Sequence, residues 1–112
     1  MKIAISCDGN SVSEHFGRCE KYILLEVKDG KLLGKTELPN PGHEPFYLPK
    51  FLKGKGVGLV MCKGIGPRAI GLLKQLGIEV VAGVSGNIEK VIERYLEGDL
   101  EGSESTCEHL DE

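Results

Sequence analysis

The chain has 112 residues, of which 40% are hydrophobic and 28% charged, and this size and composition suit one globular domain. The net charge of −3 is unevenly spread, because residues 97–112 hold seven acids and no Lys or Arg, whereas the other 96 residues hold 14 basic and 10 acidic groups. A body with a balance of only +4 argues against nucleic-acid binding, and no apolar stretch reaches the roughly 20 residues of a membrane span.

Met1 and Lys2 lead directly into a strand-like segment, without the apolar region of a signal peptide. We therefore expect a cytoplasmic protein. In that reducing compartment the four cysteines, at positions 7, 19, 62 and 107, are expected to be thiols, metal ligands or redox groups and not disulfides.

The first half of the chain predicts three strands and a short helix. Residues 2–7 alternate and are rich in β-formers, and a loop is expected from Asp8 to about Cys19. Residues 21–27 form the second predicted strand, and residues 31–38 return antiparallel to it after the Asp29-Gly30 turn. A proline-rich loop follows, and then a short helix around residues 46–52.

The second half predicts two strands that alternate with two helices. Residues 57–62 are an apolar run of the buried-strand type, and Pro67 suits the first position of the next helix, which Gly77 ends. Residues 78–81 form the fifth predicted strand, and Asn87 is a plausible N-cap for a last helix through Leu96.

These elements predict an α/β domain over residues 1–98 and an acidic, disordered tail over residues 99–112. Right-handed crossovers place the first, fourth and fifth strands parallel and side by side. We therefore expect a five-stranded mixed sheet with the spatial order 3-2-1-4-5, in which strand 2 is antiparallel, flanked by helices.

Ligands of open α/β sheets bind beyond the carboxyl ends of the parallel strands. Cys7 and Cys62 end two strands that are expected to be neighbours, so their thiols are predicted to face one crevice. The Gly64-Ile65-Gly66 turn leads to a helix N-terminus, which favours an anion. The alternative is that both cysteines are small core residues and that the glycines serve only the turn.

The segment Ser13–Cys19 places an imidazole and a thiol four residues apart, at His15 and Cys19. Both groups are ligands for Zn, Cu or iron, and Arg18 between them could neutralise an anionic cluster or phosphate. The alternative is a surface loop in which Phe16 fills the core and Arg18 is solvated.

Further candidate ligands are Cys107 and His109 in the tail and His43 in the proline-rich loop. The alternatives are a solubilising acidic end and an ordinary exposed histidine. The chain has no G-x-S-x-G nucleophile motif and no P-loop. Nuclease chemistry needs several clustered acids, and only Asp8 stands at the expected place.

Several of these segments, taken together, resemble one family. They are the opening strand with Asp8-Gly9, residues 13–18, the hairpin, residues 64–69, and Gly83-Val84 before the last helix. Over residues 1–98 the chain is similar to the dinitrogenase iron–molybdenum cofactor biosynthesis family, which includes NifX-like and NafY-like proteins and the C-terminal part of NifB.

The resemblance implies a ribonuclease H-like fold without nuclease activity. It also implies that the protein carries an iron–sulfur or iron–molybdenum-type cluster, or its precursor, between donor and acceptor proteins without catalytic turnover. His15 matches the family's best candidate cluster ligand, and Cys19 completes the same His-Phe-Gly-x-Cys pattern.

The first hypothesis is thus a metallocluster carrier. His15 is its lead ligand, followed by Cys19 and Cys7, with Cys62, His43, Cys107 and His109 as helpers. In this hypothesis Arg18 and the helix N-terminus with Gly64, Gly66 and Arg68 offset the negative charge of the cluster. The second hypothesis is a cofactor-free interaction or regulatory domain whose acidic tail docks on a basic partner, and the third is an enzyme acting on a phosphorylated small molecule.

Overall fold

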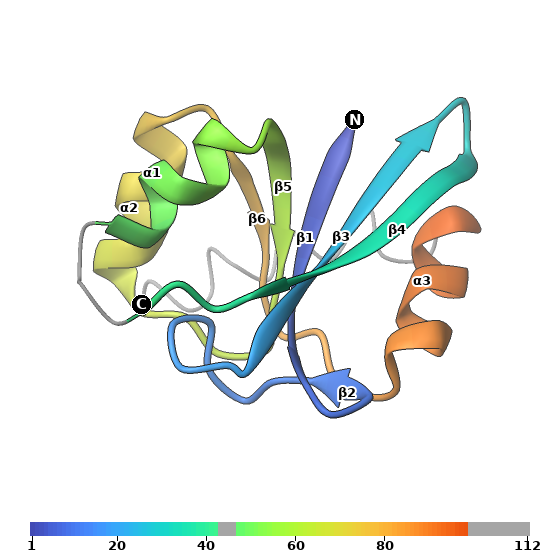
Figure 1. The fold of residues 1–112 in the computed structure, drawn as a ribbon, viewed down its shortest axis with the longest axis horizontal. Coiled ribbons are helices and arrows are strands. Elements are labelled where there is room, and N and C mark those ends of the chain that lie inside the picture. The colour runs from blue at the N-terminus through green and yellow to red at the C-terminus, as the bar shows by residue number, and fades with distance from the viewer. Residues whose placement is uncertain (43–46, 99–112) are drawn as a thin grey trace.

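A mixed β-sheet forms the centre of the molecule, in a computed structural model that describes residues 1–42 and 47–98 (Figure 1). The strands are β1 (Lys2–Asp8), β2 (Ser11–Val12), β3 (Lys21–Lys28), β4 (Lys31–Pro39), β5 (Val57–Met61) and β6 (Glu79–Val81). The helices are α1 (Tyr47–Gly54), α2 (Pro67–Gln75) and α3 (Ile88–Leu96).

The main path of the sheet has the order β4-β3-β1-β5-β6, which confirms the predicted arrangement of the five longer strands. Strand β3 is antiparallel to both β1 and β4, whereas β5 is parallel to β1 and to β6. The expectation of only five strands is wrong, because the sheet has six.

The additional strand, β2, lies in the segment that was expected to be a loop. It pairs antiparallel with β1 through Cys7 and Val12, and the backbone N–H of Val12 donates to the carbonyl of Gly86 at 2.9 Å. A strand of two residues is too short to show an alternating pattern, so its position depends on these two partners that are distant in the chain.

The helices cover the two faces of the sheet unequally (Figure 1), with α1 and α2 on one face and α3 on the other. Alternate residues of β1 point to the two layers. Ile5 belongs to a core with Val91 and Ile92 of α3, whereas Ala4 belongs to a core with side chains of α1 and α2. This alternation gives the domain two separate cores.

The helix boundaries follow local signals in the sequence. The side-chain oxygen of Asn87 accepts from the backbone N–H groups of Glu89 at 2.8 Å and Lys90 at 3.4 Å, which confirms Asn87 as the N-cap of α3. Pro67 occupies the start of α2, and Gly77 follows its end with a φ of 79°. No helix of the described segments is long and apolar enough to span a membrane.

Candidate functional site

The segments around His15 and Gly64, which are 49 residues apart in the sequence, lie side by side at the carboxyl ends of β1 and β5. His15 and Gly64 form an isolated parallel bridge. The N–H of Phe16 donates to the carbonyl of Gly64 at 2.8 Å, and the N–H of Gly64 donates to the carbonyl of Glu14 at 3.1 Å. These bonds join the two sequence motifs into one structural unit.

Gly64 has a steric role in this unit, because the two backbones come very close. A Cβ atom at Gly64 would lie 2.7 Å from the carbonyl oxygen of Glu14, which is shorter than any ordinary contact. The glycine of the motif therefore does more than permit a turn: it permits the close approach that holds the segment bearing His15.

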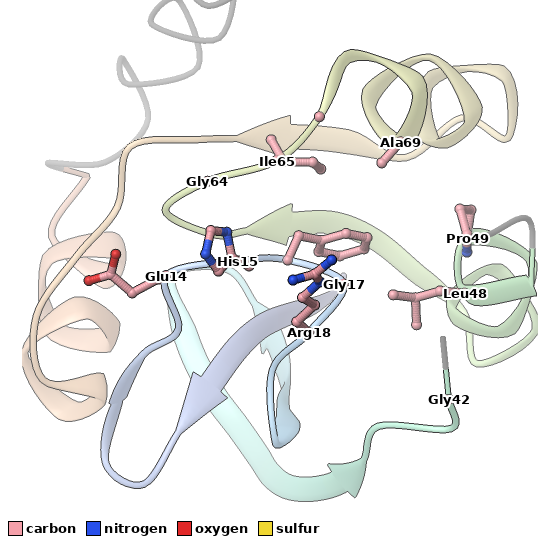
Figure 2. A pocket seen from close by; sticks show the side chains of 12 residues that line it. Glu14, His15, Gly17, Arg18, Gly42, Leu48, Pro49, Gly64, Ile65 and Ala69 are labelled. Carbon is pink, nitrogen blue, oxygen red and sulfur yellow. The ribbon is translucent and has the colours of Figure 1, made fainter. Parts of the chain in front are cut away.

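The backbone of His15 is held on both sides, while its side chain is exposed. Its N–H lies 3.2 Å from the hydroxyl of Ser13, which in turn donates to the carbonyl of His15. The imidazole points away from the sheet toward the open pocket beside Gly64 and Arg18 (Figure 2). A rigid backbone thus presents an accessible nitrogen ligand.

Below His15, the buried side chain of Phe16 closes the interior. The hydroxyl of Tyr22 donates to the carbonyl of Phe16 at 2.6 Å, and the two rings meet edge to face at 5.8 Å. The thiol of Cys19 lies 3.5 Å from the same carbonyl. Tyr22 and Cys19 therefore support the turn from within the core.

An open pocket of about 1150 Å³ lies in front of this turn (Figure 2). Glu14, His15 and Arg18 form its polar side, while apolar groups of α1, of α2 and of the loop before α2 form the opposite wall. That wall includes Leu48, Pro49, Ile65 and Ala69. Ligand pockets usually measure about 300–1,000 Å³, so this one could admit a substantial ligand.

The N-terminus of α2 adds the partial positive charge of its helix dipole at this pocket. Gly66 is the N-cap and supplies no side-chain cap, and the first turn of α2 contains no acid. Gly64, Gly66 and Arg18 all line the pocket. The helix dipole and the Arg18 guanidinium both favour an anion, although Glu14, which pairs with Lys63 at 3.3 Å, adds one negative charge.

Cys7 and Cys62 do not face one crevice, which corrects the expectation of a shared thiol site. Their strands are neighbours as expected, with Ile5 opposite Met61. Side chains alternate along both strands, so Cys7 points into the α3 core, whereas Cys62 points into the core below α1 and α2. Cys7 and Cys62 stand at corresponding strand ends but differ by one position in register. Their side chains therefore lie on opposite faces of the sheet.

The three cysteines in the described segments are buried, with exposed fractions of 1% for Cys7, 4% for Cys19 and 0% for Cys62. Burial raises the pKa of the Cys7 and Cys19 thiols above the usual value, which favours the protonated form. Burial also raises the pKa of Tyr22, with a further contribution from its hydrogen bond to Cys19. Cys19 and Cys62 share one core with Tyr22 and Phe16.

The structure thus gathers four of the predicted site residues at one pocket, namely His15, Arg18, Gly64 and Gly66. Arg68 is exposed on the first turn of α2 outside the pocket lining. His43, Cys107 and His109 lie outside the described residues, as does the tail that was predicted to be disordered.

Sequence reasoning missed the apolar wall and the supporting hydroxyl of Tyr22. Leu48, Pro49 and Ala69 read as ordinary core positions of two helices, and nothing local indicates which positions border a pocket. A weak signal existed for Tyr22, since a tyrosine at an inward strand position usually has a hydrogen-bond partner.

Comparisons with known proteins agree with the arrangement of these motifs. The model of the family described as "Dinitrogenase iron-molybdenum cofactor" matches residues 1–98. An uncharacterized protein of Methanocaldococcus jannaschii, MJ0580, is 35% identical over 106 residues, which are 90% of each chain.

Solved structures share the fold. The crystal structure of PH0822 is 35% identical, with a TM-score of 0.85 over 89% of this chain and 92% of that one. The apo form of the orange protein from Desulfovibrio gigas superimposes with a TM-score of 0.75 over 88% of this chain and 89% of that one. At 20% identity the latter likeness concerns the fold alone.

Proposed function

This chain belongs to the dinitrogenase iron–molybdenum cofactor family, and from that premise we propose that it binds and carries an iron–sulfur or iron–molybdenum-type cluster, or a precursor of one. The observation that carries the proposal is the exposed His15 imidazole on a rigidly held turn at a large open pocket. The cluster is cargo, and the protein is a carrier without turnover.

The set of available ligands suits a preassembled cluster better than a bare metal ion. A structural zinc site needs four protein ligands, and in the described segments no group of three or more His, Cys, Asp or Glu side chains is placed to hold an ion. The irons of a preassembled cluster already have sulfide ligands, so His15 would supply one terminal ligand and groups that arrive with the cargo would supply the others. His15 is therefore the lead ligand, and Cys19, Cys7 and Cys62 would need to become exposed before they could join it.

The electrostatics of the pocket fit anionic cargo. Clusters built from sulfide and thiolate carry negative charge, and Arg18 together with the uncapped N-terminus of α2 supplies compensating positive charge. The apolar wall of Leu48, Pro49 and Ala69 limits water on the other side of the pocket. In this proposal Arg68, Cys107 and His109 are auxiliary groups.

We further propose that the fold belongs to the ribonuclease H-like group without nuclease activity, and that the protein works in the cytoplasm. Its partners would be proteins that donate or accept the cluster. An open pocket with an exposed ligand suits such transfer, because cargo can enter and leave without a large rearrangement of the fold.

The test is anaerobic incubation with a preformed iron–sulfur cluster that has exchangeable thiolate ligands, followed by removal of free cluster and measurement of iron and sulfide per chain and of the visible absorption. The wild type should load a coloured cluster. His15→Ala should load clearly less, because the exposed nitrogen ligand is gone. Arg18→Ala should lower loading as well, since it removes positive charge without removing a ligand.

Lys28→Ala is the matched control, because Lys28 is an exposed cation of β3 away from the pocket lining, and it should load like the wild type. Equal loading of His15→Ala and wild type would remove His15 as a ligand. A wild type that takes up no cluster would reject the carrier proposal and favour the cofactor-free interaction domain.

A further inference from the structure

The layer formed by α1 and α2 carries charge of a single sign. From residue 47 to residue 78 the sequence contains six basic side chains and no acid. All six are exposed: Lys50, Lys53, Lys55, Lys63, Arg68 and Lys74. Helix α3, which lies on the opposite face of the sheet (Figure 1), contains both acids and bases.

Lys53 and Lys74 lie in the last turns of α1 and α2, and Lys55 directly follows α1. The ammonium of Lys53 lies 3.8 Å from the Cβ position of Gly77, at the end of α2. Lys2 joins the same end, since its ammonium donates to the carbonyl of Lys55 at 3.2 Å. We call the exposed cations Lys2, Lys50, Lys53, Lys55 and Lys74 the basic face.

Ion pairs do not neutralise this face within the described segments. The salt bridges there join Lys21 to Glu37, Lys35 to Glu89 and Lys63 to Glu14, and none includes a member of the basic face. Like charges that are gathered on one surface repel each other, and an acidic segment placed over them relieves that repulsion. The basic face therefore suits an acidic occupant.

The same chain contains such an occupant. Residues 99–112 hold six acids and no Lys or Arg. These 14 residues follow Gly98 and could span about 46 Å at 3.3 Å per residue, which exceeds the 32 Å longest extent of the molecule. Covalent attachment also gives the segment an effective concentration in the millimolar range.

We propose that residues 99–112 bind to the basic face of their own chain. Exposed ion pairs contribute about 0–1 kcal/mol each, so several weak contacts hold the segment reversibly. An acidic surface of a partner protein would compete with the segment for the same lysines.

The test uses paramagnetic relaxation in the full chain. A thiol-specific spin label is attached to Cys107, because Cys7, Cys19 and Cys62 are buried, and mass spectrometry confirms one label per chain. Amide signals of α1 and of the last turn of α2 should be lost, whereas those of the β3–β4 hairpin should persist. About 1 M salt, which shortens the Debye length to about 3 Å, should restore the lost signals.

Two triple variants with equal charge change separate this face from other cations. Lys50→Glu/Lys53→Glu/Lys74→Glu should restore the lost signals, while Lys28→Glu/Lys31→Glu/Lys90→Glu should leave the loss unchanged. Signals that are lost equally on all surfaces, or that stay lost in the first variant, would overturn the proposal. So would an equally strong loss in a mixture where the spin label and the isotope label are on different chains, because the occupant would then be a second copy.

Discussion

Gly64 and Tyr22 both hold the turn that carries His15. Gly64 does so through two backbone hydrogen bonds to Glu14 and Phe16, and Tyr22 through a buried hydroxyl that donates to the carbonyl of Phe16 at 2.6 Å. A single intramolecular hydrogen bond contributes about 1 kcal/mol. The position of His15 therefore depends on its neighbours Gly64 and Tyr22, and its geometry can be disturbed without changing His15 itself.

Gly64→Ala should destabilise the fold by about 1–3 kcal/mol, the usual cost of overpacking. The added methyl group would meet the carbonyl oxygen of Glu14 at 2.7 Å, and this neighbour is backbone that cannot move freely. Urea unfolding at neutral pH measures the change. The same variant should also load less cluster, because the His15 segment must shift.

Gly17→Ala serves as the control for this prediction. Gly17 lines the same pocket, but a Cβ at that position would have no atom within 4 Å. Its stability should stay within about 0.5 kcal/mol of the wild type. A Gly64→Ala chain as stable as the Gly17→Ala chain would contradict the close-approach role of Gly64.

Among the elements, α3 has the clearest local start signal and also borders the site-bearing loops. Its N-cap residue, Asn87, forms an isolated bridge with Ser11 of β2, so the beginning of the helix is tied to the strand that leads into the His15 turn. The cap therefore orders both a helix and a neighbouring loop. Loss of the cap should therefore destabilise both α3 and this loop.

Asn87→Ala should lower the free energy of unfolding by about 1 kcal/mol, because it leaves the N–H groups of Glu89 and Lys90 without their side-chain acceptor. Asn87→Asp keeps an acceptor and adds a charge that the helix dipole favours, so it should behave like the wild type. Denaturant midpoints compare the three chains. If Asn87→Asp lowered the denaturant midpoint as much as Asn87→Ala, the amide group would act in some way other than capping.

At the scale of the whole molecule, two buried thiols and a buried phenol make the stability of the fold depend on pH. The Cys7 and Cys19 thiols have a pKa raised above the unfolded value of 9.0, and Tyr22 is raised as well, each mainly by burial. Above pH 9.0 the folded chain therefore holds protons that the unfolded chain has released. Since the folded state then binds more protons, the free energy of unfolding falls as pH rises.

We expect the free energy of unfolding to begin to fall near pH 9, with a slope of up to about 1.4 kcal/mol per pH unit for each buried group. Urea unfolding across this pH range measures it. A Cys7→Ala/Cys19→Ala chain will be less stable at neutral pH, but its alkaline slope should be shallower, because two titrating thiols are absent. An unchanged slope in that variant would show that other groups cause the loss.

The order of the five longer strands, the caps of α2 and α3 and the pairing of two distant motifs around one site could be predicted from the sequence. These features depend on local signals, such as Pro67 and Asn87, or on the general handedness of crossovers. His15 could also be proposed as a ligand from the sequence, because it lies within a recognisable motif and an imidazole can bind a metal wherever the loop lies in the fold.

Tertiary structure alone decided which face each thiol joins, where β2 forms and why Gly64 is a glycine. Cys7 and Cys62 occupy similar strand ends, but a shift of one residue in register reverses the face of a side chain. Strand β2 exists only because Val12 meets β1 and Gly86, and the requirement at Gly64 arises from the carbonyl of Glu14. Each of these depends on contacts between segments that are distant in the chain. A local sequence pattern does not show which distant segments meet in the fold.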